Sequence, residues 1–431
     1  MTNFSRRTLL AGTGAIALVA AAGCSAGGGG AAQAPSTTVR ITLANHVWTE
    51  NVKKAIPEFE KATGLKLEIT QLAEDQLSDQ YNVKLNAGTS EIDVMMYRPL
   101  QEGRLFAQNK YFADLTEKAK GDAAWNVGDF QASPMSATTH NGQIVGIPII
   151  TEREVLYYRK DVLSKLGIEV PKTLDELKAA AKKIKEAGEM SGFVARTGKS
   201  PAVTQFSSFL FSMGGDFVDA AGKASVNTDA AKQAYALYGE LIREYGPANV
   251  STDMSWPEAM AVFTQGQAAF YTEADSLYKN ATDPAKSKVS DTVGFAQFPA
   301  GPGGSKPYNI PSWALGVNAA STNVENAWKF IQWATSKEQV AAQQKSGIPG
   351  ARSSVWESAD GISSYPTDLA KAITDSAKVG VDHDRPVVAQ VVKAREAVGQ
   401  PIVDSIKGGD LSASVETAQK AFQAVLDAEK K

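Results

Sequence analysis

The feature that most constrains the fold is a repeated exchange between strand-like and helix-like hydrophobic patterns. Residues 39–43 and 65–70 alternate apolar and polar side chains, as strands with one buried face do. The segment between them, which ends at Ala62, and residues 76–87 read as helices, and residues 92–97 form a third strand-like run. Strand, helix, strand, helix, strand is typical of a parallel α/β lobe.

The alternation restarts after Ile150, which indicates a second lobe. Residues 154–159 are strand-like, and residues 173–176 form a capping box that opens a helix. A second capping box at residues 255–258 opens another helix, and helical patterns dominate the remainder, including residues 386–406. We therefore expect two α/β lobes, each with a parallel-rich sheet flanked by helices.

Chain length supports the same division. The chain has 431 residues, which is more than one hydrophobic core usually supports. The strongest interior break is the Pro/Gly-rich stretch at residues 299–304. We predict an N-terminal lobe from residues 39–149 and 300–335, and a C-terminal lobe from residues 150–299 and 336–431.

Residues 1–23 predict export. They combine a basic start with an uncharged run of 16 residues, shorter than the roughly 20 that a membrane-spanning helix needs. Arg6 and Arg7 lie in a stretch that resembles the twin-arginine signal, which implies export of an already folded protein.

Cys24 is the only cysteine in the chain. With Ala21, Ala22 and Gly23 it resembles a bacterial lipobox, in which the cysteine is acylated, for example by palmitate, and becomes the mature N-terminus. Residues 24–38 are rich in Gly, Ala and Ser and read as a flexible tether. We expect a protein that is lipid-anchored to the outer face of the cytoplasmic membrane; the alternative is an ordinary secretory peptide with an unmodified cysteine.

Several kinds of chemistry are absent from the sequence. The formal net charge of −3 argues against nucleic acid as a partner. The three histidines, His46, His140 and His383, lack metal-ligand spacing. The chain has no Walker loop, no dinucleotide fingerprint and no nucleophile elbow. We expect no metal, no cofactor and no catalysis.

Four blocks together resemble the family 1 extracellular solute-binding proteins, the maltose-binding-protein-like receptors of carbohydrate ABC importers. Residues 146–167 are similar to the family's first interlobe crossing, and residues 258–270 to the helix and strand that follow. Residues 313–321 resemble the segment after the second crossing, and residues 347–355 its G-x-P-x-R turn. The resemblance spans residues 39–428.

The resemblance implies a two-lobed, type II-like periplasmic-binding-protein fold with the ligand in a cleft between the lobes. Closure of the lobes would follow from better binding of the ligand to the closed form. It further implies a monomeric receptor that delivers a monosaccharide, small oligosaccharide, polyol or amino sugar to the permease of an ABC importer.

Two alternatives stay open at this point. One is a receptor for a non-sugar cationic solute such as a polyamine, which acidic groups in the cleft would favour. The other is an exported carbohydrate-active enzyme that uses Glu152, Glu273 or Asp275 as acid and base.

Sugars present paired hydroxyls and apolar ring faces, so their sites need carboxylates, amides, arginines and aromatic rings. Such groups converge at the carboxyl ends of parallel strands. The candidate ligand-binding residues are Trp48, Tyr97, Arg98, Glu152, Asp216, Glu273, Asp275, Trp313 and Arg352.

The candidates differ in what supports them. Trp48 follows the first strand and either stacks on the ligand or packs under its loop. Tyr97 and Arg98 end a strand where the family often places an aromatic and a charged contact. Glu152 lies in the first crossing, where the family often has a carboxylate that binds hydroxyls. Asp216 resembles a cleft-facing residue, with an Asx turn as the alternative.

The family often has a Gly-x-Trp arrangement after the strand at residues 268–271, where this chain has Glu273 and Asp275. The missing tryptophan suggests a smaller or more polar ligand, with Trp313 supplying the stacking surface. Arg352 either reaches the cleft or forms an ion pair between lobes.

Overall fold

A computed structural model describes residues 36–188 and 190–429. The predicted signal at residues 1–23, the lipidation site Cys24 and most of the predicted tether at residues 24–38 lie outside the described residues. None of the helices in the described part of the chain is both long and apolar enough to cross a membrane.

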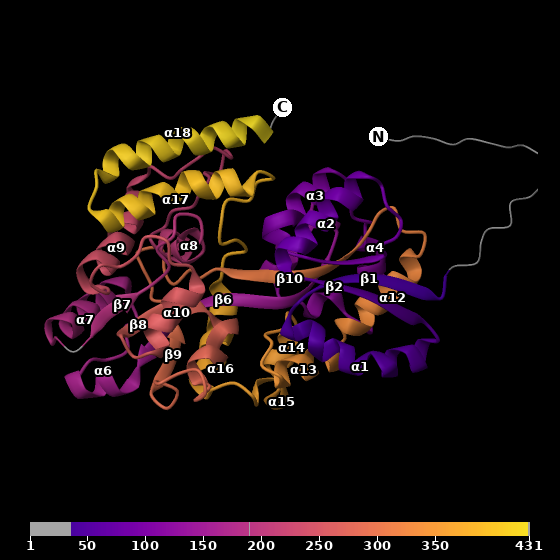
Figure 1. Cartoon of the computed structure of the whole chain (residues 1–431), viewed down its shortest axis with the longest axis horizontal. Coiled ribbons are helices and arrows are strands. Elements are labelled where there is room, and N and C mark those ends of the chain that lie inside the picture. Colours follow the sequence, from indigo (N-terminus) through magenta and orange to yellow (C-terminus); the bar gives the residue numbers. More distant parts are fainter. Residues whose placement is uncertain (1–35, 189, 430–431) are drawn as a thin grey trace, which may run out of the picture. The chain divides into compact units, whose positions relative to one another are not determined.

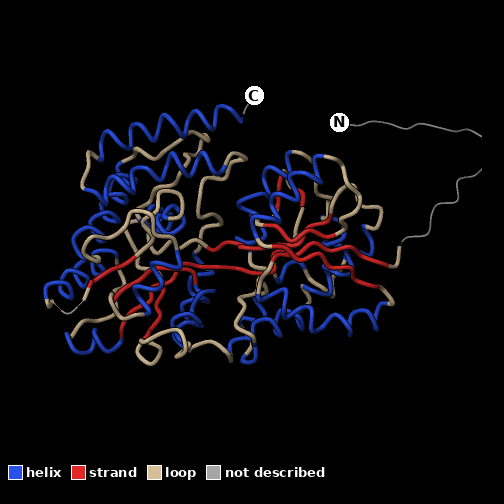
Figure 2. Tube along the Cα trace, in the orientation of Figure 1, coloured by secondary structure: helices blue, strands red, loops and turns tan. Residues whose placement is uncertain are grey.

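The strands form a mixed sheet and a separate hairpin (Figure 2). In sheet order the strands are β2 (Lys66–Leu72), β1 (Thr38–Ala44), β3 (Val94–Tyr97), β10 (Asn309–Val317), β6 (Ile147–Arg159), β8 (Ala268–Ala274) and β7 (Ser191–Val194), with β9 (Val293–Gln297) also paired to β6. The hairpin consists of β4 (Thr139–His140) and β5 (Gln143–Ile144). β1 pairs in parallel with β2 and β3, and β7 with β8, whereas every antiparallel ladder of the sheet includes β6 or β10.

Helices cover the faces of the sheet, as Figure 1 shows. The α-helices are α1 (Val47–Thr63), α2 (Glu74–Asn86), α3 (Arg104–Gln108), α4 (Thr116–Gly121), α5 (Ala132–Ala137), α6 (Lys160–Leu166), α7 (Leu174–Glu186), α8 (Ala202–Ser212), α9 (Asp229–Tyr245), α10 (Trp256–Thr264), α11 (Tyr278–Thr282), α12 (Val324–Ala334), α13 (Lys337–Lys345), α14 (Ser353–Trp356), α15 (Ala359–Ile362), α16 (Thr367–Val379), α17 (Val391–Lys407) and α18 (Leu411–Glu429). Single turns of other helix types are η1 (Pro99–Gly103), η2 (Val127–Asp129) and η3 (Asp275–Leu277). The α/β fold class is confirmed.

Local sequence signals account for many helix boundaries. α1 ends where Gly64 adopts a left-handed conformation with φ of 69°, which glycine reaches without a Cβ clash. The predicted capping boxes of Thr173 and Ser255 both form, at the starts of α7 and α10. The prediction for residues 386–406 was too long at its start, because α17 begins only at Val391.

Buried apolar side chains collect into cores at the two ends of the sheet. The first core includes Ile41 of β1 and Phe330 of α12, and the second includes Phe206 of α8 stacked on Tyr235 of α9 at 4.2 Å between ring centroids. β6 contributes to both, with Ile149 in the first core and Leu156 in the second, and its Val155 and Tyr157 lie in a third cluster at the same end as the second. Burying one such side chain contributes about 2 kcal/mol, so the core at each end stabilises that end of the molecule. The paired strands β6 and β10 run between the two ends.

Candidate functional site

A pocket of about 320 Å³ is lined by residues from both crossing strands and from both ends of the sheet. The lining residues are Asn45, His46, Arg98, Leu100, Gln101, Glu152, Arg196, Thr204, Trp256, Ala274, Leu277, Ile310, Pro311, Ser312, Trp313, Asp384 and Arg385. The loops after β1 and β3 contribute Asn45 and Arg98, and β6 and β10 contribute Glu152 and Trp313. The pocket therefore lies between the two cores, where a ligand can contact both.

Two tryptophans supply flat apolar surface to the pocket. Trp313 was predicted and lies on β10, with its ring centroid 6.3 Å from that of His46. Trp256 was missed, because its place inside a capping box marked it only as a helix start. Its side chain is 38 % exposed, which is unusual for an indole and leaves a ring face available to a ligand.

Arg98, also predicted, is held in one orientation by its neighbours. Its backbone N–H donates to Glu102 Oε2 at 2.9 Å and its Nε–H to Glu102 Oε1 at 3.0 Å. Its Nη2 donates to Ser78 Oγ at 2.8 Å, and its guanidinium carbon lies 5.9 Å from the ring centroid of Trp313. The guanidinium thus reaches the pocket as a fixed donor beside an aromatic face.

Glu152 is the carboxyl group of the crossing strand that faces the pocket, as predicted. Its Oε1 accepts a hydrogen bond from Ser276 Oγ at 2.8 Å. Burial, helped by the nearby carboxylates Asp275 and Glu273, raises the pKa of Glu152 to about 7. The group therefore changes charge near neutral pH, where it switches between acceptor and donor of hydrogen bonds.

Arg196, in the loop after β7, was missed by the sequence reading. Its Nε donates to Glu273 Oε2 at 2.9 Å and its Nη2 lies 2.5 Å from Glu273 Oε1. Although burial opposes the charge, Glu273 raises the pKa of Arg196, so the guanidinium at the pocket stays charged. Glu273 itself is fully buried, also accepts from Tyr271, and does not line the pocket.

Asp275 lies behind the pocket rather than in its lining. It is fully buried against the fully buried Arg153, with 2.7 Å between Arg153 Nε and Asp275 Oδ2. The backbone N–H of Arg153 donates to its other oxygen at 3.0 Å. Glu273 and Asp275 thus hold arginines in place, and we leave both out of the proposed ligand contacts.

The two predicted aromatic candidates near the first strands are core residues. Trp48 and Tyr97 are 1 % and 0 % exposed, and neither lines the pocket. The ring of Tyr97 packs against Phe112 at 4.6 Å between centroids. The loop that carries Trp48 instead presents Asn45 and His46 to the pocket.

Asp216 and Arg352 also lie outside the pocket lining. Asp216 Oδ1 is 3.0 Å from His383 Nε2. Arg352 is buried, forms an ion pair with Asp129 at 3.0 Å, and lies 4.3 Å above the ring of Phe130. Arg352 thus forms an ion pair whose guanidinium packs on Trp125 and Phe130, two residues of the first core.

The segment between α16 and α17 contributes a second unpredicted arginine. Arg385 Nη1 donates to Gln101 Oε1 at 3.1 Å, and its Nε donates to Asp384 Oδ1 at 2.6 Å. Asp384 is fully buried; burial alone would raise its pKa, but Arg385 lowers the pKa to about 2. The pair therefore stays ionised and links the second half of the chain to Gln101 in η1.

The pocket combines three fixed arginines, one titrating carboxyl and two indoles. Arginine forks and amides suit the hydroxyl pairs of a polyhydroxy ligand, and indole faces suit its C–H surfaces. Within residues 36–188 and 190–429, no three His, Cys, Asp or Glu side chains are placed to hold a metal ion.

Comparison with known proteins shows the family to which this chain belongs. Residues 46–341 match the family described as bacterial extracellular solute-binding protein. An erythritol/L-threitol-binding protein of Mycolicibacterium smegmatis is 25% identical over 387 residues, which cover 80% of each chain. Because the family match spans more than half of the chain, this protein belongs to the bacterial extracellular solute-binding proteins.

Two solved structures show the same fold. The ABC transporter solute-binding protein from Agrobacterium radiobacter K84, in complex with ribitol, is 25% identical, has a TM-score of 0.76, and covers 90% of this chain and 98% of its own. The maltose-bound MalE3 of T. maritima is 26% identical, has a TM-score of 0.75, and covers 90% and 99%. The predicted family resemblance and the two-lobed binding-protein fold are confirmed, and the chain is a receptor rather than an enzyme.

Proposed function

We propose that this chain captures a polyol or a small sugar in the pocket between its two cores and delivers it to the permease of an ABC importer. The observation that carries the proposal is a pocket whose lining combines three fixed arginines, Glu152 and the indoles of Trp256 and Trp313. A relative named for erythritol and L-threitol, and a similar structure with bound ribitol, support this ligand class.

The pocket recognises hydroxyls and carbon faces with different groups. Arg98, Arg196 and Arg385 donate to hydroxyl oxygens, while ionised Glu152 accepts from a hydroxyl. Trp313 packs in the first core, and Trp256 begins α10, which packs on β8 at the other end of the sheet. A ligand that touches both is therefore bound best when the two ends approach each other. The ligand therefore drives closure through its differential affinity.

The lining argues against a polyamine. Asp384 is already neutralised by Arg385, and Glu152 is only partly ionised at neutral pH because its pKa is about 7. A polycation would meet three guanidinium groups in the pocket lining, and one of them, Arg196, acts on Glu152, the one carboxyl that could receive it.

Thermal unfolding of the purified chain with single ligands tests the proposal. The Tm is measured with each of five polyols or sugars (erythritol, ribitol, D-mannitol, D-glucose and maltose) and compared with the Tm in spermidine. A ligand at a hundredfold excess over its Kd stabilises the native state by about 2.7 kcal/mol, so at least one polyol or sugar should raise the Tm. A rise with spermidine and none with any polyol or sugar would contradict the proposal.

A matched pair of variants ties the effect to the pocket. Trp313→Ala should abolish the ligand-induced rise, whereas Trp333→Phe, on α12 outside the pocket lining, should preserve it. Equal rises in wild type and Trp313→Ala would remove Trp313 from the ligand contacts.

We also propose that the chain is exported and works as a monomer anchored through a lipid on Cys24. The lipobox-like residues before Cys24 and the match to an extracellular family support this reading. Mass spectrometry of the membrane fraction should find an acylated Cys24 at the mature N-terminus; an unmodified Cys24 there would contradict the anchor. The lobe limits given above remain a proposal.

A further inference from the structure

Arg395 on α17 is a partly buried cation directly behind the ligand pocket. Its Nε and Nη2 donate to the backbone carbonyl of Ser200 at 3.0 and 2.6 Å, and its Nη2 also donates to Thr204 Oγ1 at 3.1 Å. Thr204 lines the pocket, whereas Arg395 does not. Contacts to neutral oxygens therefore hold this guanidinium against the rear of the pocket wall.

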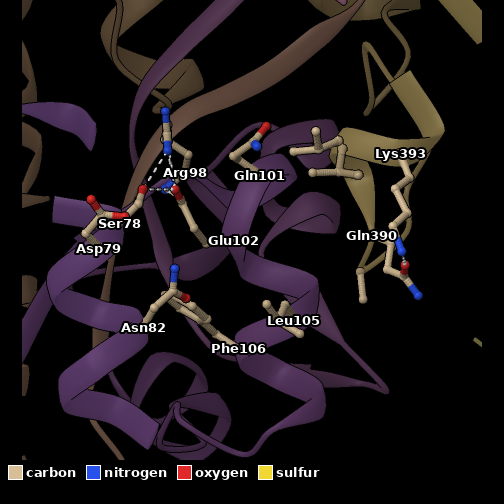
Figure 3. Close-up of a pocket in the computed structure, with 13 residues that line it drawn as sticks. Ser78, Asp79, Asn82, Arg98, Gln101, Glu102, Leu105, Phe106, Gln390 and Lys393 are labelled. Atoms are coloured by element: carbon tan, nitrogen blue, oxygen red, sulfur yellow. Dashed lines mark hydrogen bonds and ion pairs between the residues drawn. The ribbon is translucent and has the colours of Figure 1, made fainter. Parts of the chain in front are cut away.

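Three carboxylates beside or in the pocket lining each form an ion pair with an arginine that lines it. The pairs are Glu102 with Arg98, which Figure 3 shows, Glu273 with Arg196, and Asp384 with Arg385. Arg395 is the fourth guanidinium of this group, and within residues 36–188 and 190–429 it forms no ion pair of its own. The pocket and its wall thus hold one more guanidinium than paired carboxylates.

The charge of Arg395 acts on the arginines of the lining. Burial, and then repulsion from Arg385, lowers the pKa of Arg395 to about 9. Arg196 and Arg98 add smaller repulsions, which Asp384 opposes. Arg395 is therefore still charged at neutral pH, and its positive charge adds to that of the lining.

The lining arginines keep N–H groups for a ligand although they are paired. A guanidinium has five N–H donors. Arg196 donates to Glu273 through Nε and Nη2, and its Nη1 makes no hydrogen bond to another described residue. Arg385 donates twice to Asp384 and once to Gln101, which leaves two of its N–H groups. The pocket can therefore bind a further acceptor, and an anionic acceptor most strongly.

Glu152 offsets the excess positive charge only in part. It accepts a hydrogen bond from Ser276, and its pKa of about 7 leaves it partly protonated at neutral pH. A protonated carboxyl group donates a hydrogen bond, so in this form Glu152 can face an anionic ligand group without repulsion.

We propose that the ligand carries a carboxylate, as an aldonate or a uronate does, and that the arginines of the lining bind this group. One excess guanidinium matches the single charge of a carboxylate, whereas a phosphate group carries about −1.5 to −2. Guanidiniums also bind carboxylates through paired N–H donors. The proposal rests on the function proposed above and narrows its ligand class to acidic sugars and polyols.

Pairs of probes that differ in the acid group test this ligand class. Calorimetry near neutral pH measures the affinity of the full chain for D-gluconate against D-glucitol, and for D-glucuronate against D-glucose. In at least one pair the acid should bind about tenfold more tightly than its neutral partner, which corresponds to about 1.4 kcal/mol. D-glucose 6-phosphate should bind no more tightly than D-glucuronate.

Arg395→Gln removes the excess charge without changing the pocket lining. It should reduce the ratio of acid to neutral affinity about fivefold, because a charge in a partly desolvated wall is weakly screened. Arg395→Lys keeps the charge and should retain most of the ratio. Arg243→Gln is the matched control, because Arg243 also donates from a helix to a backbone carbonyl, that of Ser405 at 2.6 Å, but lies outside the lining. It should leave the ratio unchanged.

The absence of an acid advantage in both pairs would overturn the carboxylate, while binding of a neutral probe would leave the proposed function intact. An unchanged ratio in Arg395→Gln, an equal loss in Arg395→Lys, or tighter binding of the phosphate than of D-glucuronate would also overturn it. Failure of every neutral and acidic probe to bind would overturn the function and this inference together.

Discussion

Glu152 and Glu154 are two residues apart on β6 but lie in different surroundings. Glu152 faces the pocket, whereas Glu154 is fully buried beside the hydroxyls of Ser208 and Thr272. Burial raises the pKa of Glu154 well above its ordinary value, so the folded state holds this carboxyl neutral.

We predict that Glu154→Gln stabilises the protein at alkaline pH. In the unfolded chain Glu154 ionises above about pH 4.3, whereas the folded state keeps its proton, so the free energy of unfolding of wild type falls as pH rises. Glutamine has no such titration. Denaturant unfolding should show the variant more stable by about 1–3 kcal/mol at pH 8, with the difference shrinking toward pH 4.5. An equal difference at both values would contradict a neutral Glu154.

Glu152 should make ligand affinity depend on pH. Its pKa of about 7 means that it loses its charge between pH 8 and 6, and with it the ability to accept two hydroxyl donors. Its neighbours Asp275 and Glu273 are each held by an arginine, Arg153 and Arg196 respectively.

We expect affinity for whichever polyol or sugar raises the Tm to fall about tenfold from pH 8 to pH 6 in wild type, and to be low and flat in Glu152→Gln. Calorimetry at the two pH values measures this. His46 does not contribute, because burial lowers its pKa to about 4. The same pH dependence in the variant would assign the titration to another group.

At the scale of elements, helix packing limits which sequences the second core accepts. Gly399 lies inside α17, where a Cβ would overlap the backbone carbonyl of Lys199. At Gly239 of α9, a Cβ would overlap the side chain and backbone of Ser405 on α17. These glycines allow helices to approach closely, at the usual entropic cost of glycine in a helix.

Gly399→Ala should therefore destabilise the fold, although helix propensity alone favours alanine by about 1 kcal/mol. The overlap with a backbone atom should lower the free energy of unfolding by about 1–3 kcal/mol. Gly121→Ala is the matched control, because a Cβ at that helical position meets nothing within 4 Å. Urea unfolding measures the free energy of unfolding of both variants. If Gly399→Ala were as stable as wild type or more stable, α17 would be able to shift and the prediction would be wrong.

Strand β6 shows where element prediction from sequence stops. Residues 154–159 were recognised by their pattern, but the strand already begins at Ile147 and includes Pro148. Proline cannot donate to a ladder, and opposite it the register of β10 is irregular between Pro311 and Ala314. The pairing that makes this segment a strand comes from a partner far along the chain.

At the scale of the whole molecule, the pocket lies between two cores, and the paired strands β6 and β10 run from one core to the other. Ligand contacts on both sides should shift the population toward a closed arrangement. We predict that the radius of gyration, measured by small-angle scattering, falls when the pocket-binding ligand is added. It should not fall in Trp313→Ala at the same ligand concentration; an unchanged radius in saturated wild type would contradict closure.

The sequence by itself determined the α/β class, the strand and helix alternation of the first lobe, the two capping boxes and the family. These are local properties, because hydrophobic periodicity and caps act over a few residues. It also identified Arg98, Glu152 and Trp313 as residues that line the pocket.

Only the tertiary structure decided which of the remaining candidates line the pocket. Glu273 meets Arg196 from 77 residues away, and Asp275 meets Arg153 from 122 residues away. A buried carboxylate needs a cation as its partner, and the fold supplies that cation from a distant segment. The predicted acids therefore lie behind the pocket, and Arg196 lines it instead.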